Sequence, residues 1–187
     1  MSVITYFSRS EIAGSSFNSK EFLQHIVELT NKYSYSNNIL IAINHIILNT
    51  AAFNYTDDFQ ILIPHLKGII ENQDGHYNSN AIRFAIGAMT NLIHSEKIQQ
   101  IALESNIFLH VISQMSNFME DQEFVSEGLT FLYNFACDTT LQGKCCAQLR
   151  LCNIKQFLCN IREKHSENGK IRHEIQLIRG PLYISKH

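Results

Sequence analysis

The sequence contains no tryptophan, and only two prolines and eight glycines occur among its 187 residues. An all-β fold of this size needs a turn about every 8 to 12 residues, and turns depend on glycine and proline. The scarcity of both residues therefore favours helices. Because 45% of the residues are hydrophobic, the chain still has enough apolar side chains for a continuous core, which argues against disorder.

The chain has little net charge, with a formal value of −2. Such a value does not steer a whole molecule onto nucleic acid or an anionic membrane, so we expect neither as a partner. The charge is unevenly distributed: 7 Lys and Arg oppose 14 Asp and Glu up to residue 149, whereas 8 basic residues oppose 3 acidic ones from Arg150 onward. The acidic part could attract a basic partner, or opposite ends of two copies could meet. Alternatively, these charges only solvate outer helix faces.

Long apolar runs are also missing. The first residues, MSVITYFSRSEIAGSS, lack the apolar core of roughly 7 to 15 residues that a signal peptide has, and no segment reaches the roughly 18 apolar residues of a membrane span. A cytoplasmic or nuclear location is therefore expected. The glycosylation sequon Asn54-Tyr55-Thr56 carries little weight, because such triplets are common by chance.

Motifs of catalysis and metal binding are absent from the sequence. No phosphate-binding glycine loop, H-E-x-x-H or G-x-S-x-G occurs, and no spacing pairs a cysteine with His110 or His165, so we expect no enzyme and no cofactor. The cysteines form no C-x-x-C pair and predict buried reduced thiols; a metal site or a redox switch is the alternative. They are Cys137, Cys145, Cys146, Cys152 and Cys159.

A repeat is present. Asn49, Asn91 and Asn134 recur 42 and then 43 residues apart, each near the end of an apolar stretch with helical spacing. The three stretches match position by position, except that polar residues stand at two positions of the first. Their apolar stripes are Ile39, Leu40, Ile43, Asn44, Ile46, Ile47, Thr50 and Ala51; Ala81, Ile82, Ala85, Ile86, Ala88, Met89, Leu92 and Ile93; and Phe124, Val125, Gly128, Leu129, Phe131, Leu132, Phe135 and Ala136.

The segments between these stretches repeat as well, each with a short amphipathic piece followed by a longer apolar one, such as EKIQQIALES and NIFLHVISQMSNFM. Each unit is therefore predicted to contain a short, a middle and a long helix. Asp57, Asp121 and Asp138 stand where they could cap helices, and Pro64 stands where a first helical turn tolerates proline.

The stretch GAMTNLIHSEKIQQIALESNIFLHVISQM resembles the junction between two repeats of the armadillo family, and the resemblance covers roughly residues 20 to 180. The resemblance implies an all-α, right-handed α-solenoid of about three three-helix repeats plus caps, in one domain covering residues 1–187. Residues 1–18 are expected to form a poorly patterned N-terminal cap. Residues 169–187 are expected to form a degenerate C-terminal cap, because Gly180-Pro181 stands at the asparagine position and proline disrupts helices.

In armadillo repeats the third helices line a concave groove, and their asparagines bind the main chain of an extended peptide. A carboxamide suits this role, since it offers both donors and an acceptor. The alternative is that each asparagine satisfies neighbouring backbone groups. Nuclear-import members carry tryptophans four positions before the asparagine, where this chain has His45, Gly87 and Thr130, so a standard import receptor is not expected.

The predicted function is thus a protein–protein interaction adaptor that binds an extended peptide or a helix of another protein in this groove. The alternative is a self-assembling or scaffold subunit, a homo-oligomer included. Phe84 and Tyr133 are either apolar anchors or core, Arg83 could pair with an acidic ligand, and the acidic residues near Glu127 have a structural explanation at a helix start. The partner-binding candidates are Asn49, Arg83, Phe84, Gly87, Asn91, Glu127, Thr130, Tyr133 and Asn134.

Overall fold

A computed structural model describes residues 19–53, 57–137 and 141–184. These residues form ten α-helices and one 3-10 helix and include no strand, so the all-α prediction is confirmed. Asp138, the sequon and the predicted N-terminal cap lie outside the described residues. The helices are α3 (Lys20–Lys32), α4 (Asn37–Phe53), η1 (Asp57–Leu62), α5 (Ile63–Glu71), α6 (Ser79–Leu92), α7 (Glu96–Glu104), α8 (Ile107–Asn117), α9 (Gln122–Cys137), α10 (Gln142–Leu151), α11 (Ile154–Lys164) and α12 (Gly169–Ile184).

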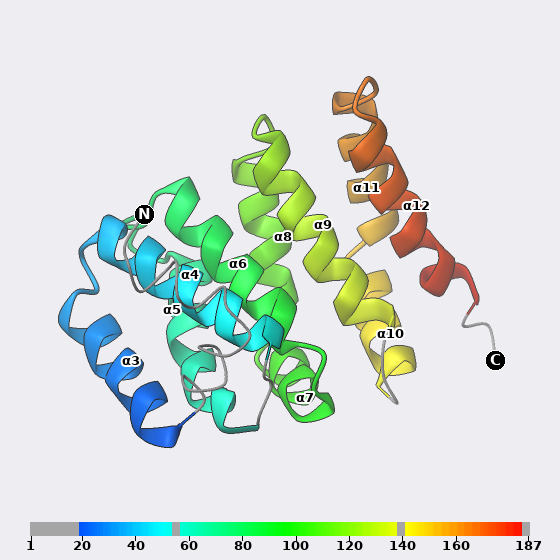
Figure 1. The fold of residues 1–187 in the computed structure, drawn as a ribbon. Helices are drawn as coiled ribbons and strands as arrows, with labels where there is room; N and C mark the ends of the chain where they lie inside the picture. Colours follow the sequence, from blue (N-terminus) through cyan, green and yellow to red (C-terminus); the bar gives the residue numbers. More distant parts are fainter. Residues whose placement is uncertain (1–18, 54–56, 138–140, 185–187) are drawn as a thin grey trace.

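The helices follow the predicted order of short, middle and long. One set is η1, α5 and α6, the next is α7, α8 and α9, and the last is α10, α11 and α12, while α3 and α4 precede them. The long helices lie side by side, with α4 packed on α6, α6 on α9 and α9 on α12 (Figure 1).

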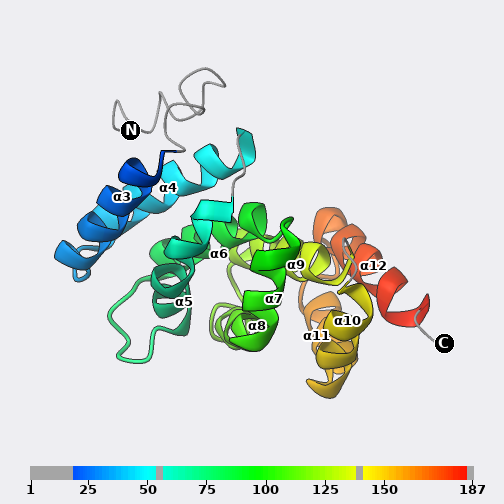
Figure 2. The ribbon, with the colours of Figure 1, turned by 90° about the horizontal axis from the view of Figure 1, so that it is seen from below.

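The middle helices α5, α8 and α11 form a second row below the long helices (Figure 2). Each packs against the long helix of its own set. One surface of α4, α6, α9 and α12 therefore points away from the middle helices, and we call it the long-helix face.

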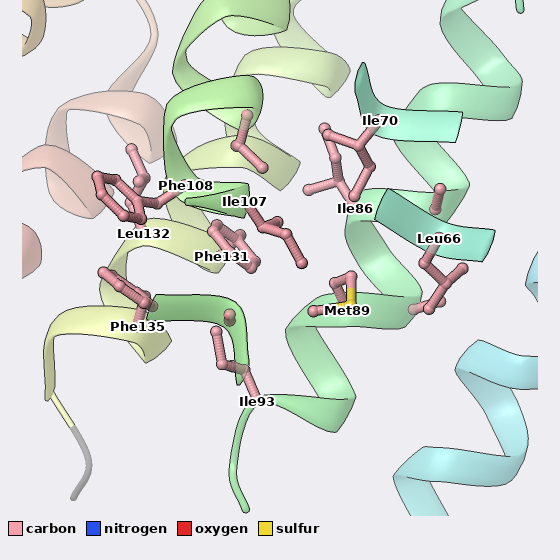
Figure 3. Close-up of a cluster of buried hydrophobic side chains, with 14 of the residues drawn as sticks. Leu66, Ile70, Ile86, Met89, Ile93, Ile107, Phe108, Phe131, Leu132 and Phe135 are labelled. Atoms are coloured by element: carbon pink, nitrogen blue, oxygen red, sulfur yellow. The ribbon is translucent and has the colours of Figure 1, made fainter. Parts of the chain in front are cut away.

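The core lies between the two rows and continues from one set to the next. All residues of the predicted stripes on α6 and α9 are buried, and on α4 all but the half-buried Ile39 are. Figure 3 shows side chains of α5, α6, α8 and α9 meeting in one cluster, in which the rings of Phe108 and Phe135 stack with centroids 5.1 Å apart. Such burial contributes about 25 cal/mol per Å² of apolar surface and dominates the stability of the stack.

The two polar residues within the α4 stripe are buried and hydrogen-bonded. Asn44 Nδ2 donates to the carbonyl of Ala81 on α6 at 3.3 Å, and the Thr50 hydroxyl donates to the carbonyl of Ile46 at 2.7 Å. A buried polar group is costly only when it lacks a partner, so both residues fit the core.

Helix ends follow the sequence signals. Asp121 Oδ1 accepts hydrogen bonds from the N–H groups of Glu123 and Phe124, both at 3.0 Å, and so caps α9. Pro64 stands in the first turn of α5, where its missing N–H costs no helical hydrogen bond.

The last helix continues through Pro181 to Ile184, so residues 169–184 form a full long helix that packs on α9. Proline removes one helical hydrogen bond here, because the missing N–H of Pro181 would pair with the carbonyl of Leu177, and the packing of the helix on α9 offsets this cost. The side chain of Arg150 on α10 supports this turn, since its Nε and Nη2 donate to the Leu182 carbonyl at 3.1 and 2.7 Å.

Candidate functional site

The candidate binding residues all come from three of the long helices: one from α4, four from α6 and four from α9. Gly87 is buried and the others are half-buried. The fourth long helix, α12, extends the same row (Figure 1). The candidates are thus brought into one row of helices, although they lie up to 85 residues apart in the chain.

The asparagine amides tie consecutive long helices together. Asn91 Nδ2 donates to the carbonyl of Leu48 at 2.8 Å, and Asn134 Nδ2 donates to the carbonyl of Thr90 at 3.3 Å. In both cases the acceptor directly precedes the asparagine of the previous long helix. Satisfying a neighbouring backbone group is therefore part of what these side chains do.

These contacts use only part of each carboxamide, which has two N–H donors and an oxygen with two lone pairs. Within the described residues, the Asn91 side chain makes no hydrogen bond besides the one to Leu48. Its oxygen retains the capacity to accept from a ligand. Asn134 Nδ2 also lies 3.3 Å from His94 Nε2.

Arg83 is already paired within the chain. Its Nη1 lies 2.7 Å from Glu123 Oε2 on α9, and its guanidinium lies 4.9 Å from the centroid of the Phe84 ring. The Phe84 ring in turn meets the His45 ring of α4 edge to face, with centroids 3.8 Å apart. Arg83, Phe84 and His45 therefore bridge three helices, and an acidic ligand would have to compete with Glu123 for Arg83.

Gly87 makes room for side chains from both neighbouring helices. A Cβ atom on Gly87 would lie 2.8 Å from Leu48 Cδ1 of α4 and 3.0 Å from Glu127 Oε1 of α9. Glu127 thus extends across α6. Burial raises the pKa of its carboxyl, and the nearby Glu174 adds to the rise, whereas Arg83 and Lys170 oppose it.

A pocket of about 280 Å³ opens between α9 and α12. Its walls combine the apolar side chains of Leu129 and Leu177 with the ring of Tyr133. Polar groups stand beside them: the Thr130 hydroxyl donates to the Ser126 carbonyl at 3.0 Å, and the Ser126 hydroxyl donates to Glu174 Oε1 at 2.8 Å. The lining residues are Leu129, Thr130, Tyr133, Lys170, His173, Glu174 and Leu177.

Sequence reasoning missed the residues that α12 contributes to this pocket, because the departure at Gly180-Pro181 led to a prediction of a degenerate cap. A signal did exist. The buried residues Ile171, Ile175, Ile178 and Leu182 of α12 repeat the α9 positions Phe124, Gly128, Phe131 and Phe135 at a constant offset of 47 residues. The offset between α9 and α12 is four residues longer than the 43-residue offset between α6 and α9, so a search at a fixed period misses this match.

A second, larger hollow of about 550 Å³ lies at the short helices and contains none of the candidate residues. Five of its seven lining residues are polar or charged, and the lining comes from η1, α7 with its N-cap, and the residue before α10. The residues are Asp57, Ser95, Glu96, Lys97, Gln100, Ile101 and Leu141.

The two histidines considered for catalysis are paired with groups other than thiols, and the two cysteines considered with them are buried. Cys145 and Cys146 are buried, which raises the pKa of Cys145 to about 12 and raises that of Cys146 as well. Thiols with such pKa values are poor nucleophiles at neutral pH. His110 Nε2 lies 3.0 Å from Glu71 Oε1, and His165 Nε2 lies 2.8 Å from the Met119 carbonyl oxygen.

Two further properties concern the described part of the chain as a whole. It holds no cluster of three or more His, Cys, Asp or Glu side chains suited to a metal ion. Within the same residues, no helix combines the length and the apolar character that crossing a membrane requires.

Comparison with known proteins adds no relative. No protein-family model matches the chain, and no curated protein matches it either.

Proposed function

We propose that this chain is a non-enzymatic protein–protein interaction module, an armadillo-like right-handed solenoid that binds an extended segment of a partner protein along its long-helix face. Three successive sets of short, middle and long helices support the armadillo-like architecture, together with the row of long helices that they build. A row of parallel long helices presents equivalent positions at regular intervals, as an extended ligand requires.

The observation that carries the proposal is the common register of the asparagine amides. Asn91 and Asn134 occupy equivalent positions on adjacent helices and make equivalent contacts with the preceding helix. Each is half-buried, so part of its surface stays accessible to a ligand. The inter-helix hydrogen bond fixes the orientation of each carboxamide. A pre-oriented amide loses less conformational entropy when it pairs with the main chain of a ligand.

Self-assembly by attraction between oppositely charged ends has less support. The first described helix, α3, carries Lys20 and Lys32 together with Glu21 and Glu28. Its formal charges therefore balance, so this helix by itself offers no net negative charge to the basic C-terminal end.

A selection experiment tests the proposed function. A displayed library of random linear peptides is selected against the intact protein, and the enriched peptides are measured against two variants. Thr130→Arg places a guanidinium on the long-helix face of α9. Ser116→Arg places a guanidinium on α8, away from the long-helix face, and is the control. Both hydroxyls donate to the carbonyl four residues earlier, at 3.0 Å in each case.

We expect Thr130→Arg to weaken peptide binding at least tenfold, since it inserts a bulky, strongly solvated group where the ligand would lie. Ser116→Arg should leave binding unchanged. Thermal unfolding of both variants verifies that the fold is retained. Failure to enrich any linear peptide, or equal effects of the two substitutions, would rule out the proposed face.

A further inference from the structure

The pocket between α9 and α12 has the size of a single large side chain. Its volume of about 280 Å³ is just below the roughly 300–1,000 Å³ of typical small-molecule sites. Leu177 supplies an exposed apolar wall, with 39% of its surface accessible to solvent, and it faces Leu129 and Tyr133 across the pocket. These walls favour a flat aromatic or a branched aliphatic side chain.

Two of the polar side chains at the wall, Thr130 and Glu174, offer hydrogen-bond acceptors to an occupant. The Thr130 hydroxyl donates its proton to the Ser126 carbonyl, so only its lone pairs remain for a ligand. Glu174 Oε1 accepts from Ser126, whereas its Oε2 is buried and has no hydrogen-bond partner among the described residues. The lone pairs of the Thr130 hydroxyl and of the Glu174 carboxylate can accept from an N–H group, so a side chain that brings a donor improves the site.

A cation is a poor occupant of this pocket. Lys170 Nζ lies 3.7 Å from Glu174 Oε1, and the Lys170 side chain is 73% exposed, so an ammonium group already stands at the rim. The Glu174 carboxylate therefore already has a counter-ion, and a second cation gains little at this pocket. The occupant that fits is therefore neutral, aromatic and able to donate. Indole meets all three conditions and, unlike a phenol, is a donor only.

Building on the proposed function, we propose that the α9–α12 pocket receives a tryptophan side chain of the bound segment. The indole ring packs between Leu177 and Tyr133, and its N–H group is directed to the acceptors of Thr130 and Glu174. Tryptophan is also among the residues that contribute most to binding at protein interfaces, because its large ring loses little conformational freedom when buried.

The absence of tryptophan from the chain makes the test direct, because all indole fluorescence then comes from the ligand. N-acetyl-tryptophanamide is titrated with the full protein, with excitation at the red edge of indole absorption, where tyrosine contributes nothing. We expect a saturable blue shift of the emission. N-acetyl-phenylalaninamide, measured by competition, should bind about tenfold more weakly because it lacks the donor.

Three pocket variants and one control examine the geometry. Leu177→Glu should abolish the shift, whereas Leu109→Glu on α8 is the matched control, since Leu109 is exposed to 41%. Glu174→Gln keeps an oxygen that can accept from Ser126 but removes the negative charge, and it should reduce the preference for tryptophanamide over phenylalaninamide. Thr130→Val, nearly equal in volume, should reduce the same preference without the risk of unfolding that a charged substitution carries.

Several results would overturn the assignment. One is the absence of a saturable emission shift with the wild-type protein. Another is an equal loss of the shift in Leu177→Glu and Leu109→Glu. A third is equal affinity of the wild-type protein for the two amides, with no change in Glu174→Gln. The outcome is separable from that of the proposed function. If selected peptides bind in a Thr130-dependent way but contain no tryptophan, only the pocket assignment fails. If the amide binds and no linear peptide is enriched, only the proposed function fails.

Discussion

Gly128 offers a stringent test of the packing between α9 and α8. It is buried in the middle of α9, and a Cβ atom there would lie 2.5 Å from Cγ and 3.1 Å from Cε of Met115. Met115 is itself fully buried, so it cannot move into solvent to make room. Gly128→Ala therefore forces a clash inside a closed core.

The magnitude follows from a comparison with Gly68, which lies within α5, is exposed and would place no atom within 4 Å of an added Cβ. Gly68→Ala should stabilise the protein by about 0.5–1 kcal/mol, because alanine loses less backbone entropy in a helix. Gly128→Ala gains the same helical contribution but adds overpacking, which costs about 1–3 kcal/mol. The difference between the two variants isolates the overpacking cost.

The assay is urea unfolding followed by helical circular dichroism on both variants. We expect Gly128→Ala to unfold at lower urea than the wild type and Gly68→Ala at higher urea. In a Met115→Ala background the penalty at position 128 should disappear, which a double-mutant cycle measures as a coupling energy. Equal stabilisation by both glycine substitutions would refute the close approach of α8 and α9.

Three other predictions concern the long-helix face and the thiols. Asn91→Ala and Asn134→Ala should each lower the free energy of unfolding by about 1 kcal/mol, measured by urea unfolding, because each leaves a backbone carbonyl of the preceding helix without its donor. Glu127→Gln should stabilise the protein at neutral pH. The folded-state pKa of this carboxyl is raised, so the wild type is most stable below the unfolded-state pKa and loses stability as the pH rises through the folded-state pKa. The gain from Glu127→Gln should therefore vanish at about pH 4. An undiminished gain at that pH would contradict the burial of this carboxyl. Cys145 and Cys146 should resist a thiol reagent in the native protein and react once it is unfolded, and rapid native labelling followed by mass spectrometry would oppose this.

Helix faces could be predicted from the sequence because burial imposes a period on it. The stripes of α6 and α9 match over their whole length, since each must cover the same inner surface of its set. Even the polar Asn44 and Thr50 could be assigned to a buried stripe, because their positions were fixed by the repeat.

The direction of the asparagine side chains could not be predicted in the same way. Whether Asn91 points to a ligand or to the Leu48 carbonyl depends on the spacing between two helices that lie 43 residues apart in the chain. The pairing of Arg83 with Glu123 likewise depends on how α6 and α9 pack. These are tertiary distances, and a single sequence carries no measure of them.

The helix through Pro181 has a related explanation. Proline predicted an interruption, and its local cost is real. The helix nevertheless has the long-range contacts of a complete long helix: it packs on α9, it buries Ile171, Ile175 and Ile178, and Arg150 donates hydrogen bonds to its last turn. Tertiary contacts thus outweigh the local preference at one position.

The proposed function makes the row of long helices the binding surface. Amide chemical-shift mapping of the isotope-labelled protein with a selected linear peptide locates that surface residue by residue. We expect the perturbed residues to lie on α4, α6, α9 and α12, with the largest shifts around Asn91, Thr130 and Asn134. Shifts concentrated on α5, α8 and α11 instead would contradict the proposed binding face.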